Sequence, residues 1–247
     1  MEMLDPQLVL GAYAIGVFPM ADDREADSVY WVEPRTRAIL PLEGFRLTTS
    51  LRKTIARDRF RVTADTAFER MIALCAESAA DRPETWINGG IERAFTALHH
   101  LGFAHSIECW DGDELVGGLY GLALGRAFFG ESMVSRRTDA SKVALAWLIA
   151  RLKAGGFTLL DCQFMTDHLA SLGAVEIGRA DYCALLAGAL AGGPEGATGS
   201  SASGAASSVV SGDFFALDRL PPSAPPSEVV SGPVAGQDIV QILVHTS

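Results

Sequence analysis

The segment Ala127–Gly173 constrains the fold of this chain most strongly, because its pattern predicts two strands joined by a helix. A short apolar run, Ala127–Gly130, is typical of a buried strand. The helix that follows has a broad apolar face, with Asp139 or the threonine before it as its N-cap and Gly155 as its C-terminal cap. A second short buried strand, Phe157–Leu160, comes next. We therefore expect two neighbouring strands of one sheet, connected by this helix.

Polar residues follow both predicted strands. Glu131 follows the first strand, and Asp161, Cys162 and Gln163 follow the second. Alternate residues of a strand share a face, so Asp161 and Gln163 should project together at a strand end, where open sheets build their sites. A carboxylate beside an amide can hold an amine next to an acyl group, and Glu131 can bind a cation or act as a base. An ordinary polar strand end gives the same pattern.

Length and composition bound the class of protein. A chain of 247 residues with 49% hydrophobic residues can form one large domain or two small ones around a substantial core. Its four cysteines form no CxxC pair, so we expect neither a disulfide framework nor a metal site. The apolar stretch Leu8–Met20 is too short to span a bilayer and follows acidic residues, unlike a signal peptide. We expect a soluble cytoplasmic protein with no membrane contact.

The charge is unevenly distributed. The net charge is −10, yet the segment from Arg35 to Arg61 contains eight basic and two acidic residues, a local charge of +6. Part of this segment, Leu51–Asp58, predicts a basic helix with Ser50 as its N-cap. Such a patch can dock a phosphate backbone while the acidic remainder limits non-specific binding, although a solvated basic face is the simpler interpretation.

The other segments complete an α+β pattern. His105–Trp110 and Glu114–Leu124 predict a hairpin around Asp111-Gly112-Asp113, and with the Ala127 strand they predict three adjacent antiparallel strands. The composition then changes, because Gly188–Ser211 contains 18 Gly, Ala or Ser residues out of 24, which is typical of a flexible linker. Ile239–Val244 predicts a strand that docks the tail onto the body.

The sequence lacks the motifs of several common enzyme classes. Ser132 and Ser135 lie in GESMVS, which is not the GxSxG elbow of a serine hydrolase. The histidines lack HExxH spacing, and neither GxGxxG nor a P-loop occurs, so no nucleotide cofactor is implied. Some large apolar side chains near the candidate residues either line an apolar pocket or simply fill the core: Trp86, Phe128, Phe129, Met133 and Met165.

Taken together, the motifs resemble those of the bacterial leucyl/phenylalanyl-tRNA–protein transferase family. No single motif decides the matter, but the ordered set, which covers about residues 5–187, is highly specific. Met20 departs from the pattern, because the family often has Trp there. The matching segments are Tyr13–Pro19, Trp31 with Pro34–Ala38, Thr85–Ile87, Leu98-His99, Gly102–Trp110, Leu115–Gly121, Gly130–Ser135, Ala140–Lys142, Asp161–Gln163 and Asp167–Ala174.

The resemblance implies a fold and an activity. It implies a small N-terminal α+β domain (residues 1–61) followed by a GNAT-like acyltransferase domain (62–187) with a mixed, mostly antiparallel sheet and flanking helices. A Gly/Ala/Ser/Pro-rich linker (188–238) and a C-terminal strand (239–247) would follow. The implied enzyme moves Leu or Phe, with Met as a third candidate, from aminoacyl-tRNA to the α-amino group of proteins that begin with Arg or Lys. That transfer marks them for proteolysis, and it needs no cofactor.

The resemblance also implies roles for individual residues. Asp161 and Gln163 correspond to the catalytic pair, and Glu131 lies in the acceptor and reaction site. We expect the substrate to contact Trp86, Ser132, Met133, Phe128 and Trp31, and the tRNA to contact Arg35, Arg37, Arg52, Lys53 and Arg57.

Two rival interpretations stay open at this stage. A GNAT acetyltransferase would use acyl-CoA, but the RxxGxG phosphate loop expected at the start of the central helix is missing from Ser135–Lys142. A non-catalytic protein that binds tRNA or basic N-termini would keep the patch and the pocket but would not need Asp161 or Gln163.

Overall fold

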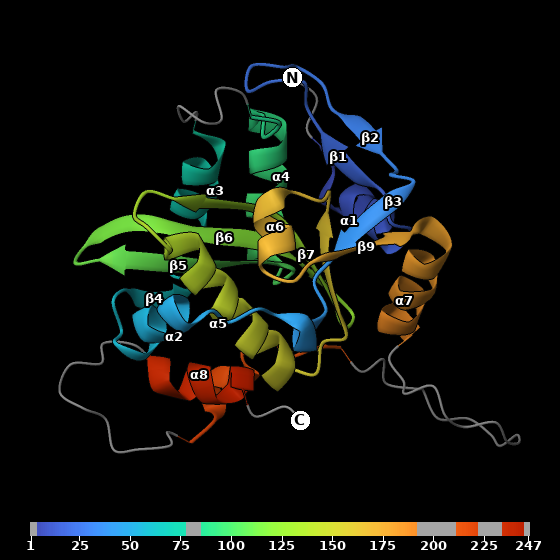
Figure 1. Cartoon of the computed structure of the whole chain (residues 1–247). Helices are drawn as coiled ribbons and strands as arrows, with labels where there is room; N and C mark the ends of the chain where they lie inside the picture. Colours follow the sequence, from blue (N-terminus) through green and yellow to red (C-terminus); the bar gives the residue numbers. More distant parts are fainter. Residues whose placement is uncertain (1–3, 78–84, 192–210, 222–233, 245–247) are drawn as a thin grey trace, which may run out of the picture.

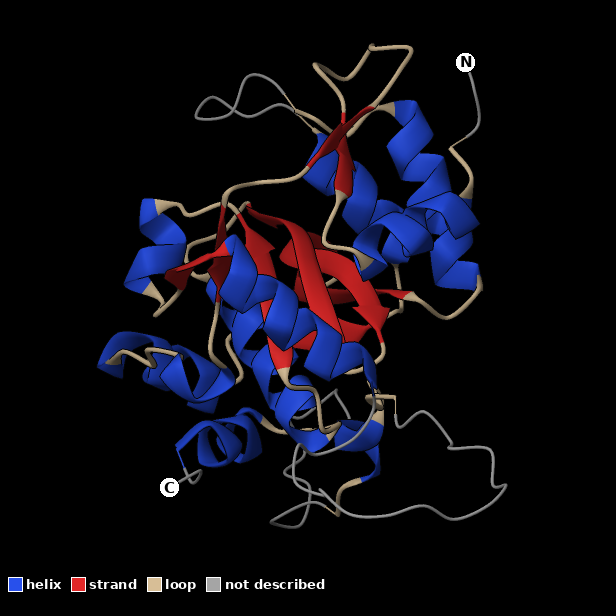
Figure 2. Cartoon of the chain, turned by 90° about the vertical axis from the view of Figure 1, so that its right-hand side faces the viewer, coloured by secondary structure: helices blue, strands red, loops and turns tan. Residues whose placement is uncertain are grey.

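The computed structural model of the chain describes residues 4–77, 85–191, 211–221 and 234–244. These residues form a mixed α and β structure (Figures 1 and 2). The helices are α1 (Pro6–Ala14), α2 (Thr49–Ala56), α3 (Phe68–Ala76), α4 (Gly89–His100), α5 (Ala140–Ala154), α6 (Asp167–Ser171), α7 (Arg179–Ala191) and α8 (Gly236–Val244), with short 3-10 turns at Leu42–Gly44 and Ala216–Arg219. The strands are β1 (Phe18–Met20), β2 (Tyr30–Val32), β3 (Thr36–Ile39), β4 (Arg61–Ala64), β5 (Ala104–Asp111), β6 (Glu114–Leu124), β7 (Ala127–Ser135), β8 (Leu159–Gln163) and β9 (Val175–Gly178).

One seven-stranded sheet, in the order β4-β5-β6-β7-β8-β3-β9, forms the centre of the molecule. Every neighbouring pair is antiparallel except β7–β8, so the predicted mixed, mostly antiparallel sheet is confirmed. The hairpin predicted at Asp111-Gly112-Asp113 joins β5 to β6, with Gly112 at φ 62°. Helices cover both faces (Figure 2), α2, α5 and α8 on one side and α1, α3, α4 and α7 on the other, which creates two apolar cores.

The predicted strand–helix–strand unit is β7–α5–β8. Because β7 and β8 are parallel neighbours, they need a crossover, and α5 provides it with Gly155 as its C-cap, as predicted. Asp139 is at the N-cap position of α5, but its φ is 68° and its side chain makes no capping hydrogen bond. β7 and β8 pair over only three residues, from Ala127↔Leu159 to Phe129↔Asp161. They then part, since β7 continues along β6 while β8 pairs with β3.

The first 61 residues form parts of two separate regions of the structure. α1 and the small β1–β2 sheet lie at one end of the molecule (Figure 1). By contrast, β3 is inserted between β8 and β9 in the large sheet, and α2 packs through Leu51 and Ile55 into the core on the α5 side. Residues 36–61 are therefore part of the large sheet and its core rather than of a separate sheet.

The C-terminal strand prediction is wrong. Ile239–Val244 belongs to helix α8, which packs on α2 and α5 with Ile239 and Val240 buried. Ile and Val favour strands, but side-chain packing decides between helix and strand more strongly than this propensity does. Here α2 and α5 provide the packing surface, and the Gly236 N–H at the start of α8 donates to Asp58 Oδ1 at 2.8 Å.

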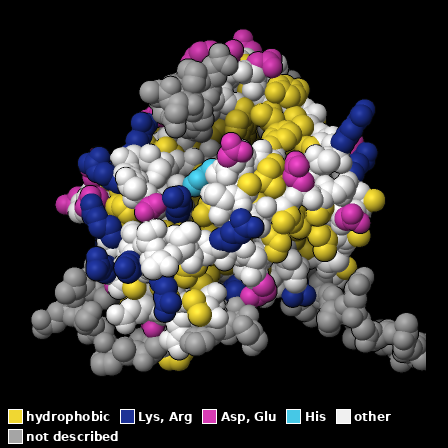
Figure 3. All heavy atoms as spheres, in the orientation of Figure 1, with side chains coloured by type: hydrophobic (Ala, Val, Ile, Leu, Met, Phe, Trp, Pro, Cys, Tyr) yellow, Lys and Arg dark blue, Asp and Glu magenta, His cyan; other side chains and the backbone are white. Residues whose placement is uncertain are grey.

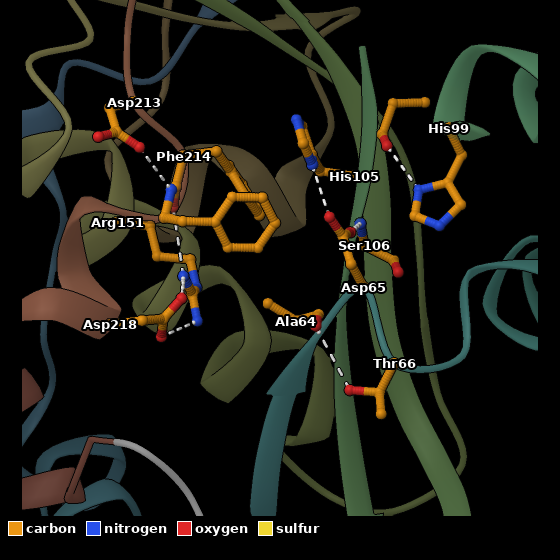
Figure 4. A network of polar contacts seen from close by, with 12 residues as sticks. Ala64, Asp65, Thr66, His99, His105, Ser106, Arg151, Asp213, Phe214 and Asp218 are labelled. Atoms are coloured by element: carbon orange, nitrogen blue, oxygen red, sulfur yellow. Dashed lines mark hydrogen bonds and ion pairs between the residues drawn. The ribbon is translucent and has the colours of Figure 1, made fainter. Parts of the chain in front are cut away.

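Part of the predicted linker is docked on the body. Phe214 stacks on His105 with ring centroids 4.0 Å apart. Both Arg151 terminal nitrogens donate to Asp218, at 2.6 and 2.7 Å (Figure 4). Residues 211–221 thus complete the apolar core on the α5 side. The rest of the predicted linker lies largely in 192–210 and 222–233, outside the described residues.

Two further observations bear on the class of protein. In the parts of the chain that the structure describes, no helix combines the length and apolarity needed to cross a membrane. Over the same residues, no three His, Cys, Asp or Glu side chains gather as the ligands of a metal ion would.

Candidate active site

A cavity of about 240 Å³ opens where β7 and β8 part. Its walls come from β1, β6, β7, β8, α5 and α6, together with Trp86 from the loop before α4. Figure 3 shows a hollow flanked by hydrophobic side chains beside the position of β1. Trp86, Ser132 and Met133, all expected at the substrate site, line the cavity.

Most of the side chains that line the cavity are apolar. Phe18 and Met20 of β1 and Trp86 are among them, so the methionine that departs from the family pattern keeps this position apolar. Burying an apolar side chain against such walls is worth about 0.8 kcal/mol per methylene. The aliphatic wall of the cavity is the set of lining residues Leu119, Met133, Leu145, Leu148, Leu160 and Leu169.

Glu131 reaches the cavity because of a β-bulge. Gly130 pairs with Gly121 and Ser132 pairs with Tyr120, so Glu131 is the extra residue in β7. A bulge bends the strand and changes the direction of a side chain, and bulges are frequent beside active sites. The strand therefore continues through the bulge to Ser135, beyond Gly130, where the sequence predicted its end.

Glu131 is half-buried, with its Oε1 atom shielded from solvent, and its carboxyl group is electrostatically unusual. Burial, and then the charge of Asp161, raise its pKa to about 8, while the Tyr13 hydroxyl and the Arg37 guanidinium counteract part of this rise. Within the described residues its Oε1 atom has no hydrogen-bond partner. Such a group is protonated at neutral pH when alone and ionises when a cation approaches, because an opposite charge stabilises the carboxylate.

Gln163 lines the cavity at the end of β8, in an unusual backbone conformation. Its φ is 57°, in the left-handed region that non-glycine residues rarely adopt. This turn breaks the alternation of the strand, so the prediction that Asp161 and Gln163 project together is wrong: Gln163 lines the cavity and Asp161 does not. The Gln163 Nε2 atom is buried without a hydrogen-bond partner in the described part of the chain, which leaves an amide donor for a substrate.

Asp161 is fully buried, and other protein groups occupy its oxygens. Arg37 donates to it from Nε at 3.0 Å and from Nη2 at 2.6 Å. The Tyr182 hydroxyl donates at 2.8 Å, and so does the backbone N–H of Gln163. Burial and the charge of Asp161 raise the pKa of Tyr182, so its hydroxyl remains a donor. Asp161 therefore acts behind the cavity wall rather than on a substrate.

The expectation that Arg37 contacts tRNA is wrong. Its side chain is 2% exposed and bound to Asp161, which is 124 residues away in the sequence. A charged residue in a basic segment is usually solvated, and local sequence carries no sign of such a distant partner.

Two residues expected to bind substrate lie elsewhere. Phe128 is fully buried in the core on the α5 side and stacks on Phe214, because alternation along β7 turns it away from the cavity. Trp31 of β2 is 39% exposed and lines a separate hollow with Asp5 and Asp27.

The basic patch survives without Arg37. Arg35, the α2 residues Arg52 and Lys53, and the α2 C-cap Arg57 are exposed. Among the described residues, none of these four forms a salt bridge. Thr48, rather than the predicted Ser50, caps α2 by accepting a hydrogen bond from the Leu51 N–H at 3.3 Å. In Figure 3, Lys and Arg side chains gather on the part of this face where Figure 1 places α2 and α5.

The sequence pattern did not reveal several residues of the site. Leu145 and Leu148 looked like the core face of a helix, and only the parting of β7 and β8 exposes them to a cavity. His168 of α6 also lines the cavity, and burial followed by the charge of Lys142 lowers its pKa, so the imidazole is neutral. The one sequence signal for His168 was its position in the Asp167-His168 motif.

Comparisons with known proteins identify the family of this chain. A sequence model described as leucyl/phenylalanyl-tRNA protein transferase matches residues 39–187, and one for the N-terminal domain of the same family matches residues 2–35. The leucyl/phenylalanyl-tRNA–protein transferase of Rhizorhabdus wittichii is 60% identical over 249 residues and covers 100% of both chains. The protein of the same name from Afipia carboxidovorans is 47% identical, covering 99% of this chain and 95% of its own.

A solved structure, that of L-PGS from Bacillus licheniformis, aligns with a TM-score of 0.36 and 12% identity over 67% of this chain and 54% of that chain, a likeness too weak to bear on fold or function. The sequence relationships are strong and span both parts of the molecule. The chain belongs to the leucyl/phenylalanyl-tRNA–protein transferase family.

Proposed function

We propose that this protein transfers Leu or Phe from aminoacyl-tRNA to the α-amino group of proteins whose first residue is Arg or Lys. The observation that carries the proposal is one cavity lined both by aliphatic side chains and by two polar groups, the Glu131 carboxyl group and the unpaired Gln163 amide. The aliphatic wall suits the side chain that is transferred. The carboxyl group suits the cationic residue that receives it.

The donor end explains the substrate class. Leu119, Leu145 and Leu148 offer an apolar surface without a buried charge, which suits Leu, Phe or Met. Such a wall separates side chains that differ by one methylene by only about 1–3 kcal/mol, so we expect a preference rather than strict selection. The parting of β7 and β8 around the cavity supports our proposal that the large domain is a GNAT-like acyltransferase domain.

The reaction needs positioning more than activation, because the aminoacyl ester is already reactive. The acceptor amine, once neutral, attacks the ester carbonyl carbon; a C–N bond forms and the bond to the ribose 3′ oxygen breaks. The proton that the amine loses passes to that oxygen, directly or through water. Gln163 holds the amine and the carbonyl at the required distance, since its amide can both donate and accept.

Glu131 accounts for acceptor choice. A guanidinium or ammonium group that enters the cavity meets a carboxyl group whose pKa is about 8 and draws it into the ionised form. A neutral or acidic first residue gains no such interaction.

Arg52, Lys53 and Arg57 at α2, with Arg35, give the tRNA a docking surface. Contacts to phosphates position the acceptor end without reading its sequence, and the acidic remainder of the chain limits other binding. We propose that the transferred residue marks its protein for ATP-dependent proteolysis in the cytoplasm, where aminoacyl-tRNA is available.

The test is transfer of radiolabelled Leu from leucyl-tRNA to matched peptides that begin with Arg, Lys, Asp or Ala, without ATP or added metal. We expect label on the Arg and Lys peptides alone. Absence of label on every peptide, with intact charged tRNA, would contradict the proposed function, and equal label on all four would contradict the role of Glu131.

A further inference from the structure

Gln163 is held in a conformation that its own residue type disfavours. A non-glycine residue in the left-handed region costs about 1–3 kcal/mol and persists only where its surroundings enforce it. Its backbone N–H donates to Asp161 Oδ1 at 2.8 Å. Asp161 thus fixes the end of β8, and the position of Asp161 depends in turn on the groups that bind its carboxylate.

Arg37 has no freedom to move. Its Nε donates to both Asp161 oxygens at 3.0 Å, and its Nη1 donates to the Gly16 carbonyl at 2.8 Å. Its guanidinium lies between two aromatic rings, 4.7 Å from the centroid of Phe18 and 4.4 Å from that of Tyr182. A planar guanidinium that contacts two aromatic rings and donates hydrogen bonds along its edge is held in one orientation, which Lys cannot reproduce.

We propose that Arg37 is a positioning residue for the transfer reaction: acting through Asp161, it holds the Gln163 amide in its place in the cavity. The proposal rests on the proposed function, because it assigns Arg37 to that reaction. Arg37 touches no substrate, since it is buried behind the cavity wall.

The same side chain joins the N-terminal unit to the reaction site. Gly16 follows α1 and has φ 81°, and a Cβ atom there would lie 2.9 Å from a ring carbon of Tyr182. Glycine at this position therefore allows the chain to approach Arg37 and Tyr182 closely. Phe18, which stacks on Arg37, also lines the cavity. Gly16 and Phe18, which lie in the Tyr13–Pro19 segment that resembles the family, thus belong to the support of Gln163.

The chain contains a matched control for a buried arginine. Arg151 also donates from two nitrogens to an aspartate, Asp218, also bonds a backbone carbonyl, that of Phe214 at 3.2 Å, and also lies on an aromatic ring (Figure 4). It is 4% exposed and does not line the cavity. Removal of Arg37 leaves the buried Asp161 carboxylate without its cationic partner, which destabilises a protein by roughly 3–5 kcal/mol. Removal of Arg151 should cost less, because the Asp218 side chain is 25% exposed. Only Arg37 supports Gln163.

The experiment compares R37M, R37K, Y182F and R151M as full-length proteins at a temperature where circular dichroism shows each to be folded. Leucyl-tRNA and an Arg peptide are the substrates, and kcat and KM are measured separately. We expect kcat to fall about 100-fold in R37M with KM changed less than threefold, as for a misplaced catalytic group. R37K should lie between R37M and wild type, and Y182F, which removes one donor to Asp161, should lose several-fold.

R151M should keep kcat within twofold of wild type. If R37M does not fold, Y182F and R37K carry the test. Values of kcat within twofold of wild type in the folded Arg37 and Tyr182 variants would overturn the inference, as would an equal loss in R151M. A wild-type protein that transfers nothing would instead contradict the proposed function.

Discussion

Replacing Glu131 by Gln should stabilise the protein, and increasingly so as the pH rises. The unfolded chain ionises this group near its ordinary pKa of 4.5, whereas the folded protein keeps it protonated up to about pH 8. The folded state therefore binds the extra proton between these values, and stability falls as the pH rises through this window. The raised pKa lowers the unfolding free energy of the wild type by about 5 kcal/mol above pH 8 and by about 3 kcal/mol at pH 7, and E131Q avoids this loss.

The assay is urea unfolding of wild type and E131Q at pH 5, 7 and 9. The quantity of interest is the change with pH of the difference in unfolding free energy between the two proteins, because a new buried amide adds a term that does not depend on pH. E176Q, on the exposed strand β9, removes the same charge at a solvated position and should show differences within about 0.5 kcal/mol. A wild type and an E131Q variant that respond equally to pH would refute the account of the Glu131 environment.

Three further predictions concern the donor wall, the tRNA surface and the tail. L148F should narrow the cavity at the aliphatic wall, so that the larger Phe side chain fits less well than Leu. With the two charged tRNAs in competition, we expect the ratio of kcat/KM for Phe transfer to kcat/KM for Leu transfer to fall by about 10-fold or more. An unchanged ratio would place Leu148 outside the donor pocket. The triple variant R52A/K53A/R57A should raise KM for leucyl-tRNA and reduce the slope of log KM against log salt concentration by roughly 2–3. Transfer from a leucyl-adenosine donor, which lacks the tRNA phosphates, should stay constant. Equal losses with both donors would contradict contacts to the phosphate backbone of the tRNA. F214A should lower the free energy of unfolding by about 3–5 kcal/mol in urea without changing kcat of the folded protein, and a variant as stable as wild type would show that the docked tail segment adds nothing to the core.

The fold was predictable where the signals are local. The β7–α5–β8 unit, the Asp111 hairpin and Gly155 as a helix cap depend on neighbouring residues only, and the structure confirms them. Ile239–Val244 shows the limit, because β-branched residues adopt a helix when α2 and α5 offer a packing surface.

The site was predictable in composition but not in arrangement. Gln163 stands at a strand end as expected, whereas Glu131 lies within β7, because the strand continues to Ser135. A bulge directs Glu131 and a left-handed turn directs Gln163, and neither has a clear sequence signature. Arg37 looked like a surface charge since its partner is 124 residues away. Pairings across such distances are decided by the sheet order, which single-sequence patterns do not contain.

The most direct test of the central claim, that Glu131 reads the acceptor's positive charge in the same cavity that binds the donor, is a comparison of peptides that begin with arginine or with citrulline, its neutral isostere. Single-turnover transfer rates would be measured for both peptides with wild type and with E131Q. A charged hydrogen bond of about 1.5–3 kcal/mol predicts that wild type prefers arginine by roughly 10- to 150-fold and that E131Q loses most of this preference. The same preference in both proteins would contradict the claim.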